Sequence, residues 1–154
     1  MNIGIIVFSR TGNTLSVAEK IREACEAQGH TTVIERVMTQ NEEPNSKLPI
    51  KLTETPDPSR YDAVFFGAPV EAFSLCAIMK AYLEQIPELP GKISCCFTTQ
   101  HFSKPWMGGN RTVRQMSDLC RAKGMKVAET GVVNWSSKSR ELQIREISSR
   151  LSKV

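Results

Sequence analysis

Apolar residues along this chain gather into two kinds of segment that alternate from one end to the other. Short continuous apolar runs, rich in β-branched and aromatic residues, predict buried strands at residues 3–8, 31–37, 61–67, 92–99 and 125–133. Between these runs, apolar residues recur at intervals of three and four, which predicts amphipathic helices at residues 14–28, 75–86, 112–123 and 139–151. The last helix has its predicted inward face at Leu142, Ile144, Ile147 and Leu151.

The alternation of strands with helices predicts an α/β fold, with a parallel sheet covered by helices on both faces. A length of 154 residues suits one domain with a substantial core. The chain contains neither an internal repeat nor a dividing linker, so we expect a single domain over residues 1–154. In open sheets of this kind, ligands bind beyond the carboxyl ends of the strands.

Residues 38–60 interrupt the alternation. Prolines, with Asn, Ser and Glu between them, exclude a long helix from this stretch; they are Pro44, Pro49, Pro56 and Pro58. We expect an extended strap that Ile50 and Leu52 hold to the core. A loop of this length is often functional, so the strap is either a partner surface or a plain crossover.

Composition excludes several classes of protein. Apolar residues make up 40% of the chain and charged residues 23%, as in ordinary soluble proteins. The apolar runs are too short to span a bilayer and the N-terminus lacks a signal-peptide pattern, so we expect a cytoplasmic protein without membrane contact. The net charge is +4, but Lys and Arg are scattered rather than arranged in a stripe, which argues against nucleic-acid binding.

The five cysteines show neither a CxxC pattern nor metal-ligand spacing. They are Cys25, Cys76, Cys95, Cys96 and Cys120. An odd number of cysteines in a chain expected in the cytoplasm favours reduced thiols packed as small hydrophobic groups. Cys95 and Cys96 are neighbours in a predicted strand, so they should point to opposite faces of the sheet. We therefore expect neither a disulfide nor a metal site.

The hexapeptide at residues 9–14 connects the first strand to the first helix. Its sequence is Ser9-Arg10-Thr11-Gly12-Asn13-Thr14. A helix N-terminus leaves backbone N–H groups without partners and carries partial positive charge, and the hydroxyl groups add further donors. The stretch therefore suits a phosphate, although Asn and Thr are also common in simple helix caps. It fits neither dinucleotide-binding nor triphosphatase glycine patterns.

Ser-x-Thr-Gly-Asn-Thr between a strand and a helix resembles the phosphate loop of flavodoxins, which holds the terminal phosphate of FMN. The resemblance covers the whole chain except the strap. It implies a three-layer sandwich with a five-stranded parallel sheet in the order 2-1-3-4-5, in which the loops after strands one, three and four converge. It also implies that Ser9, Thr11, Asn13 and Thr14 bind the phosphate through side chains, and Arg10 and Gly12 through backbone amides.

The resemblance further implies that two later loops enclose the flavin ring. One wall is expected at Ala68, Pro69, Val70, Glu71 and Ala72. Related proteins often carry an aromatic residue near position 71, and here Phe73 is the candidate replacement. The other wall is expected at Thr98, Thr99 and Gln100, with His101, Phe102 and Trp106 stacking on or shielding the ring.

Two functions follow from the resemblance. The first is an FMN-binding electron carrier of flavodoxin type, and the alternative is an NAD(P)H-dependent FMN reductase acting on a quinone, a flavin or a similar acceptor. Flavodoxins that act as shuttles are usually acidic, whereas loop 98–114 here carries Lys104, Arg111 and Arg114 and no carboxylate. We therefore expect an acidic redox partner or NAD(P)H. We assign no residue a catalytic role, and a homodimer remains open.

A regulatory module without flavin is a third interpretation, because receiver domains share this topology. Receiver domains need acidic residues at the ends of the first and third strands. Those positions hold Ser9-Arg10 and Ala68-Pro69 here, which argues against this interpretation.

Overall fold

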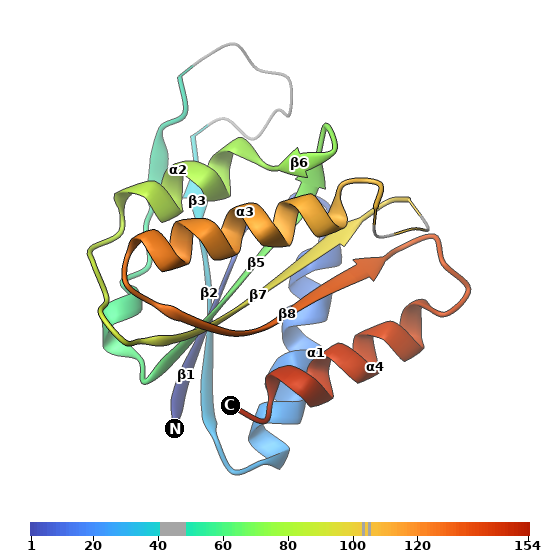
Figure 1. Cartoon of the computed structure of the whole chain (residues 1–154), viewed down its shortest axis with the longest axis horizontal. Coiled ribbons are helices and arrows are strands. Elements are labelled where there is room, and N and C mark those ends of the chain that lie inside the picture. The colour runs from blue at the N-terminus through green and yellow to red at the C-terminus, as the bar shows by residue number, and fades with distance from the viewer. Residues whose placement is uncertain (41–48, 103, 105) are drawn as a thin grey trace.

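A computed structural model describes residues 1–40, 49–102, 104 and 106–154 (Figure 1). Five parallel strands form the central sheet in the order β2-β1-β5-β7-β8. In chain order this is 2-1-3-4-5, so the predicted topology is confirmed. The strands are β1 (Asn2–Val7), β2 (Thr31–Arg36), β5 (Ala63–Glu71), β7 (Ile93–Gln100) and β8 (Lys126–Asn134).

Helices cover both faces of the sheet and complete the three layers (Figure 1). One face packs against α1 (Asn13–Ala27) and α4 (Arg140–Leu151). The other packs against α2 (Ala77–Gln85) and α3 (Gly109–Ala122). The predicted α/β sandwich is therefore correct.

Alternate residues of the central strands supply the two halves of the core. Phe65 of β5 packs on the α1/α4 side and Phe66 on the α2/α3 side, and both are fully buried. Cys95 and Cys96 of β7 divide in the same way, as expected for neighbours in a strand. This double burial explains why the central strands are continuous apolar runs.

Several element boundaries differ from the sequence prediction, and three of them lie near the carboxyl ends of the strands. β5 continues through Ala68 to Glu71, which we had expected to be a loop, and then turns back into β6 (Ser74–Leu75). α2 begins at Ala77 as a result, and α3 begins at Gly109, three residues earlier than predicted. In α4, Leu142 is 61% exposed, so its inward assignment was wrong.

The strap contains a small sheet of its own. β3 (Met38–Thr39) pairs antiparallel with β4 (Leu52–Glu54), and a 3-10 turn, η1 (Pro58–Arg60), leads into β5. Leu52 packs against the α2/α3 side of the core, as expected, but Ile50 is 44% exposed and does not hold the strap down. Residues 41–48 of the predicted strap lie outside the described residues.

All five cysteines are buried free thiols, as predicted. Burial raises the pKa of the Cys25 thiol to about 11 and the pKa values of Cys76 and Cys95 to about 12, from an ordinary value of 9.0. Among the described residues, no group of His, Cys, Asp and Glu could hold a metal ion. The helices in the described part of the chain are all too short or too polar to cross a membrane.

These pKa values predict that the free energy of unfolding decreases between about pH 9 and pH 11. The unfolded chain releases thiol protons near their ordinary pKa of 9.0, whereas the native protein retains them, so the unfolded state binds fewer protons as the pH rises. Guanidinium unfolding at pH 8, 9.5 and 11 measures the decrease. The Cys25→Ala variant should show a shallower dependence on pH, and a free energy that is flat or rises over this interval would contradict the prediction.

Candidate functional site

The carboxyl ends of β1, β5 and β7 meet at one edge of the sheet, where they surround a cavity of about 250 Å³. Each strand contributes the residues at its end or just beyond it. The lining residues are Arg10, Thr11, Asn13, Pro69, Val70, Glu71, Thr99, Gln100 and His101. The structure thus brings together the three segments that the sequence singled out.

The turn after β1 presents a run of free backbone donors beside this cavity. Gly12 has a left-handed conformation (φ 96°) and lies at the N-cap of α1, where its carbonyl oxygen accepts the Ser16 N–H at 2.9 Å. The five amides from Arg10 to Thr14 donate no hydrogen bond to any described residue. Because the helix dipole adds positive charge at the same point, the turn suits an anion.

Two of the four side chains expected to bind phosphate line the cavity, and two do not. Thr11 and Asn13 line it. The Ser9 hydroxyl is buried and accepts the Leu15 N–H at 3.2 Å, so it satisfies an amide in the first turn of α1. The Thr14 hydroxyl is also buried and hydrogen-bonds to that of Thr99 at 2.8 Å, which ties the turn to the end of β7. The side chains of Ser9 and Thr14 thus brace the turn.

An ion pair joins the turn to the end of β5. Arg10 Nε donates to Glu71 Oε2 at 2.7 Å and Arg10 Nη2 to Glu71 Oε1 at 3.3 Å. The guanidinium carbon lies 5.1 Å from the centre of the Phe8 ring. Neither charge was expected to have this role, although opposite charges after two adjacent strands were visible in the sequence.

A tight hairpin forms the wall after β5. Val70 and Glu71 pair with Leu75 and Ser74, which leaves Ala72 and Phe73 as the two turn residues, with φ angles of 50° and 61°. Both occupy the left-handed region that non-glycine residues rarely adopt, so the turn is strained. Gly108 lies against it, where a Cβ atom would come within 2.8 Å of the Phe73 Cα. The hairpin is thus held by close packing against the start of α3.

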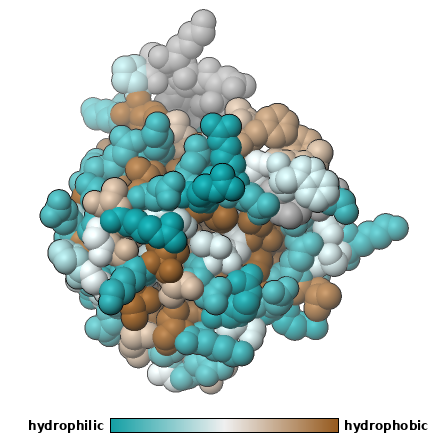
Figure 2. Space-filling view, viewed as in Figure 1, coloured by the Kyte–Doolittle hydropathy of each residue, from teal (hydrophilic) through white to brown (hydrophobic). Residues whose placement is uncertain are grey.

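A second cavity of about 230 Å³ adjoins the first and shares Val70, Gln100 and His101 with it. It is also lined by Ala72, Phe73 and Phe102, and the two phenylalanine rings stack 5.3 Å apart with 8° between their planes. Phe73 is 54% exposed and Phe102 39%. Figure 2 shows apolar surface over the β5–β6 hairpin, in contrast to the mostly hydrophilic surface around it.

The Gln100 side chain organises the loop after β7. Its amide nitrogen donates to the Asn134 side chain and to the Lys104 carbonyl oxygen, and its Oε1 atom accepts the Gly109 N–H at 3.1 Å. Thr98 is fully buried and donates to the Ala68 carbonyl oxygen at 2.6 Å. The Gln100 and Thr98 side chains therefore connect the end of β7 to the neighbouring segments of the site. Asn134 was not singled out in the sequence, which gave no local signal for it.

Trp106 lies outside the two cavities, whereas His101 lies beside both of them. Trp106 is 71% exposed, as expected for its turn, with the Lys104 ammonium 5.9 Å from its ring centre. It lines neither of the two cavities. His101 lines both and is exposed, with its ring 5.9 Å from that of Phe102.

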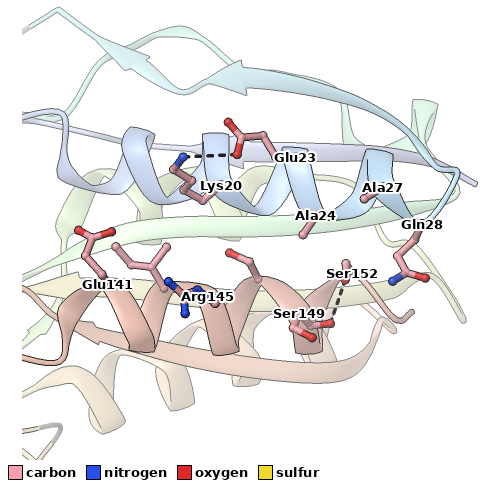
Figure 3. A pocket seen from close by; sticks show the side chains of 11 residues that line it. Lys20, Glu23, Ala24, Ala27, Gln28, Glu141, Arg145, Ser149 and Ser152 are labelled. Atoms are coloured by element: carbon pink, nitrogen blue, oxygen red, sulfur yellow. Dashed lines mark hydrogen bonds and ion pairs between the residues drawn. The ribbon is translucent and has the colours of Figure 1, made fainter.

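A separate groove of about 520 Å³ lies between α1 and α4 (Figure 3). All of its lining residues belong to the two helices or directly follow them. Lys20 and Glu23 are paired there at 3.4 Å, opposite Glu141 and Arg145 of α4. The groove lacks the convergence of three strand ends, so we place the candidate site at the edge of the sheet.

The chain resembles flavodoxins of known structure over nearly its whole length. The two-electron reduced flavodoxin of Megasphaera elsdenii is 19% identical, with 99% of each chain covered and a TM-score of 0.72. The Streptococcus pneumoniae TIGR4 flavodoxin is 14% identical, with 99% of this chain and 98% of the other covered and a TM-score of 0.71. A flavodoxin, WrbA-like protein from Agrobacterium tumefaciens is 17% identical, covering 98% and 94%, with a TM-score of 0.70.

No family model matches the chain, and neither does the sequence of any curated protein. The likeness to solved structures therefore establishes the fold, which is flavodoxin-like. Function has to be argued from the residues of the site.

The contrast between Thr14 and Thr11 predicts different effects on stability. Thr14→Val removes a buried hydrogen bond and leaves the Thr99 hydroxyl without its partner, so the free energy of unfolding should fall by about 1–3 kcal/mol. Thr11→Val alters an exposed side chain and should change it by less than about 0.5 kcal/mol. Chemical denaturation of both variants measures the difference, and equal effects would contradict the bracing role of Thr14.

Proposed function

We propose that the chain is an FMN-binding electron-transfer flavoprotein of flavodoxin type. The observation that carries this proposal is the run of five unpartnered amides at the start of α1, beside a two-part cavity. Donors that lack protein partners at a positive helix end suit a doubly charged phosphate better than a neutral ligand. The flavodoxin-like fold brings the corresponding loops to the same edge of the sheet.

The residues present fit FMN along the length of the cavity. The phosphate is assigned to the amides from Arg10 to Thr14 and to the side chains of Thr11 and Asn13. The ring is assigned to the space between residues 69–73 and 99–102. Each cavity alone is smaller than a usual ligand site of roughly 300–1,000 Å³, but together they reach that range.

FMN, when bound, supplies the electron-transfer chemistry, and the protein supplies binding, orientation and the electrostatic environment. Phe73 and Phe102 provide apolar surface that keeps water from one end of the slot. The strained hairpin has few alternative conformations because Gly108 packs against it, so its wall is fixed before binding. We assign no proton-transfer step to any side chain.

The proposal predicts that protein freed of ligand quenches the fluorescence of added FMN. Replacing Thr11 by Val together with Asn13 by Ala should weaken FMN binding about tenfold or more, because hydrogen bonds to a charged phosphate are lost. Riboflavin, which lacks the phosphate, should bind both proteins equally. Ser149→Ala on α4 is a matched control that should leave both affinities unchanged. Absence of quenching with excess FMN would overturn the proposal.

An NAD(P)H-dependent reductase is the second candidate. Lys104, Arg111 and Arg114 are exposed on the loop and helix after β7, and within the described residues none of them forms an ion pair. This positive surface would attract either an acidic partner protein or the phosphates of a dinucleotide.

Rapid mixing with NADPH separates the two candidates. A carrier should retain the visible absorbance of its flavin until a partner reductase is added, and its rate of association with an acidic partner should fall as salt rises. Rapid bleaching by NADPH alone would contradict the carrier and support the reductase. We expect no such bleaching.

A further inference from the structure

Three contacts define the position of the Arg10 guanidinium. Glu71 binds two of its nitrogen atoms, at 2.7 and 3.3 Å, and the Phe8 ring lies 5.1 Å from its central carbon. The Arg10 side chain is only 17% exposed and that of Glu71 24%. Both residues line the cavity between the strand ends. Arg10 is thus a partly buried cation that lies over an aromatic ring and is held along one edge by a carboxylate.

The remaining guanidinium nitrogen, Nη1, has no partner. It is buried and makes no hydrogen bond within the part of the chain that the structure describes. A buried donor without a partner is unfavourable, and the unfavourable free energy is recovered when a ligand supplies an acceptor. Nη1 has no accessible surface in this position, so an acceptor on a molecule bound in the cavity that Arg10 lines can reach it only when the guanidinium shifts toward that cavity.

A planar guanidinium also stacks on aromatic faces. The resemblance to flavodoxins implies that related proteins often carry an aromatic residue near position 71 as one wall of a flavin slot, where this chain has Glu71. The structure has at this place a charged pair, and the guanidinium of its planar member lies over the Phe8 ring. Arg10 therefore has the shape, the charge and the unused donor to replace that aromatic wall.

We propose that Arg10 is a direct contact to the reducible ring of the ligand and that Glu71 is the positioning residue that orients it. This inference rests on the proposed function, since the ring it concerns is that of FMN. The ligand class is a planar heteroaromatic ring with acceptor atoms at its edge, which becomes more negative when reduced. A cation beside such a ring favours the reduced form, and Glu71 offsets part of that effect.

Binding of two ligands tests whether Arg10 contacts the ring or the phosphate. Arg10→Met should weaken the binding of oxidised riboflavin and of oxidised FMN by the same factor, about fivefold, because the two ligands share the ring. A loss confined to FMN would identify Arg10 as a phosphate ligand and overturn the proposal. Arg10→Lys keeps the charge but not the planar fork, so it should restore the reduction potential better than the affinity.

Reduction potentials test the charge effect. Arg10→Met should weaken the binding of reduced FMN about tenfold more than that of oxidised FMN, which lowers the reduction potential. A tenfold difference corresponds to 59 mV for one electron. Glu71→Gln should shift the potential in the opposite direction. General structural damage would not move the potential in opposite directions. Glu129→Gln alters a remote ion pair with Arg150, which has an N–O distance of 2.8 Å, and should leave the potential unchanged.

The outcomes distinguish this inference from the function on which it rests. Failure of the unaltered protein to bind FMN overturns the proposed function, and the ring contact with it. Normal FMN binding with unchanged potentials and affinities in the Arg10→Met and Glu71→Gln variants overturns the ring contact alone. Opposite shifts in the two variants, together with equal losses for riboflavin and FMN, support it.

Discussion

The candidate site depends on the hydrogen-bond donors that α1 leaves unused at its N-terminus. A helix always begins with N–H groups that lack intrahelical acceptors, and proteins usually satisfy them with a capping side chain. Here the residue at the N-cap is Gly12, which has no side chain. The nearby Ser9 hydroxyl satisfies only the Leu15 N–H. The turn therefore leaves a concentration of donors open to water or to an anion.

The turn that carries these donors is supported from both neighbouring strands. Arg36 at the end of β2 donates to the Ser9 carbonyl oxygen at 3.0 Å, and the Phe8 N–H donates to the Gly67 carbonyl oxygen of β5 at 3.0 Å. The Thr14–Thr99 hydrogen bond adds a link to β7. Because the amides from Arg10 to Thr14 take no part in this support, they stay free to face a ligand, and the turn does not have to be ordered at the moment of binding.

Much of the fold could be predicted from the sequence, because burial on both faces forces the central strands to be apolar runs such as 61–67 and 92–99. The β5–β6 hairpin could not, since its turn residues are Ala72 and Phe73 rather than the Asn and Gly that such turns favour. Leu142 was wrongly placed on the inward face of α4, because the sequence does not distinguish an exposed leucine from a buried one. The pairing of Arg10 with Glu71, 61 residues apart, depends on which strands are neighbours, a property of the assembled sheet.

The Arg10–Glu71 pair also explains how a basic residue can lie in a turn that is otherwise neutral. An unpaired arginine at this position would leave its charge poorly solvated at 17% exposure. Glu71 compensates that charge and holds the guanidinium across the crevice, toward the wall formed by the hairpin. Under the proposed function, the phosphate would meet the backbone amides together with the Thr11 and Asn13 side chains, and the Arg10 charge would lie beside the ring. On that proposal, the two parts of the site separate binding from the tuning of redox chemistry, although adjacent residues of the same turn supply both.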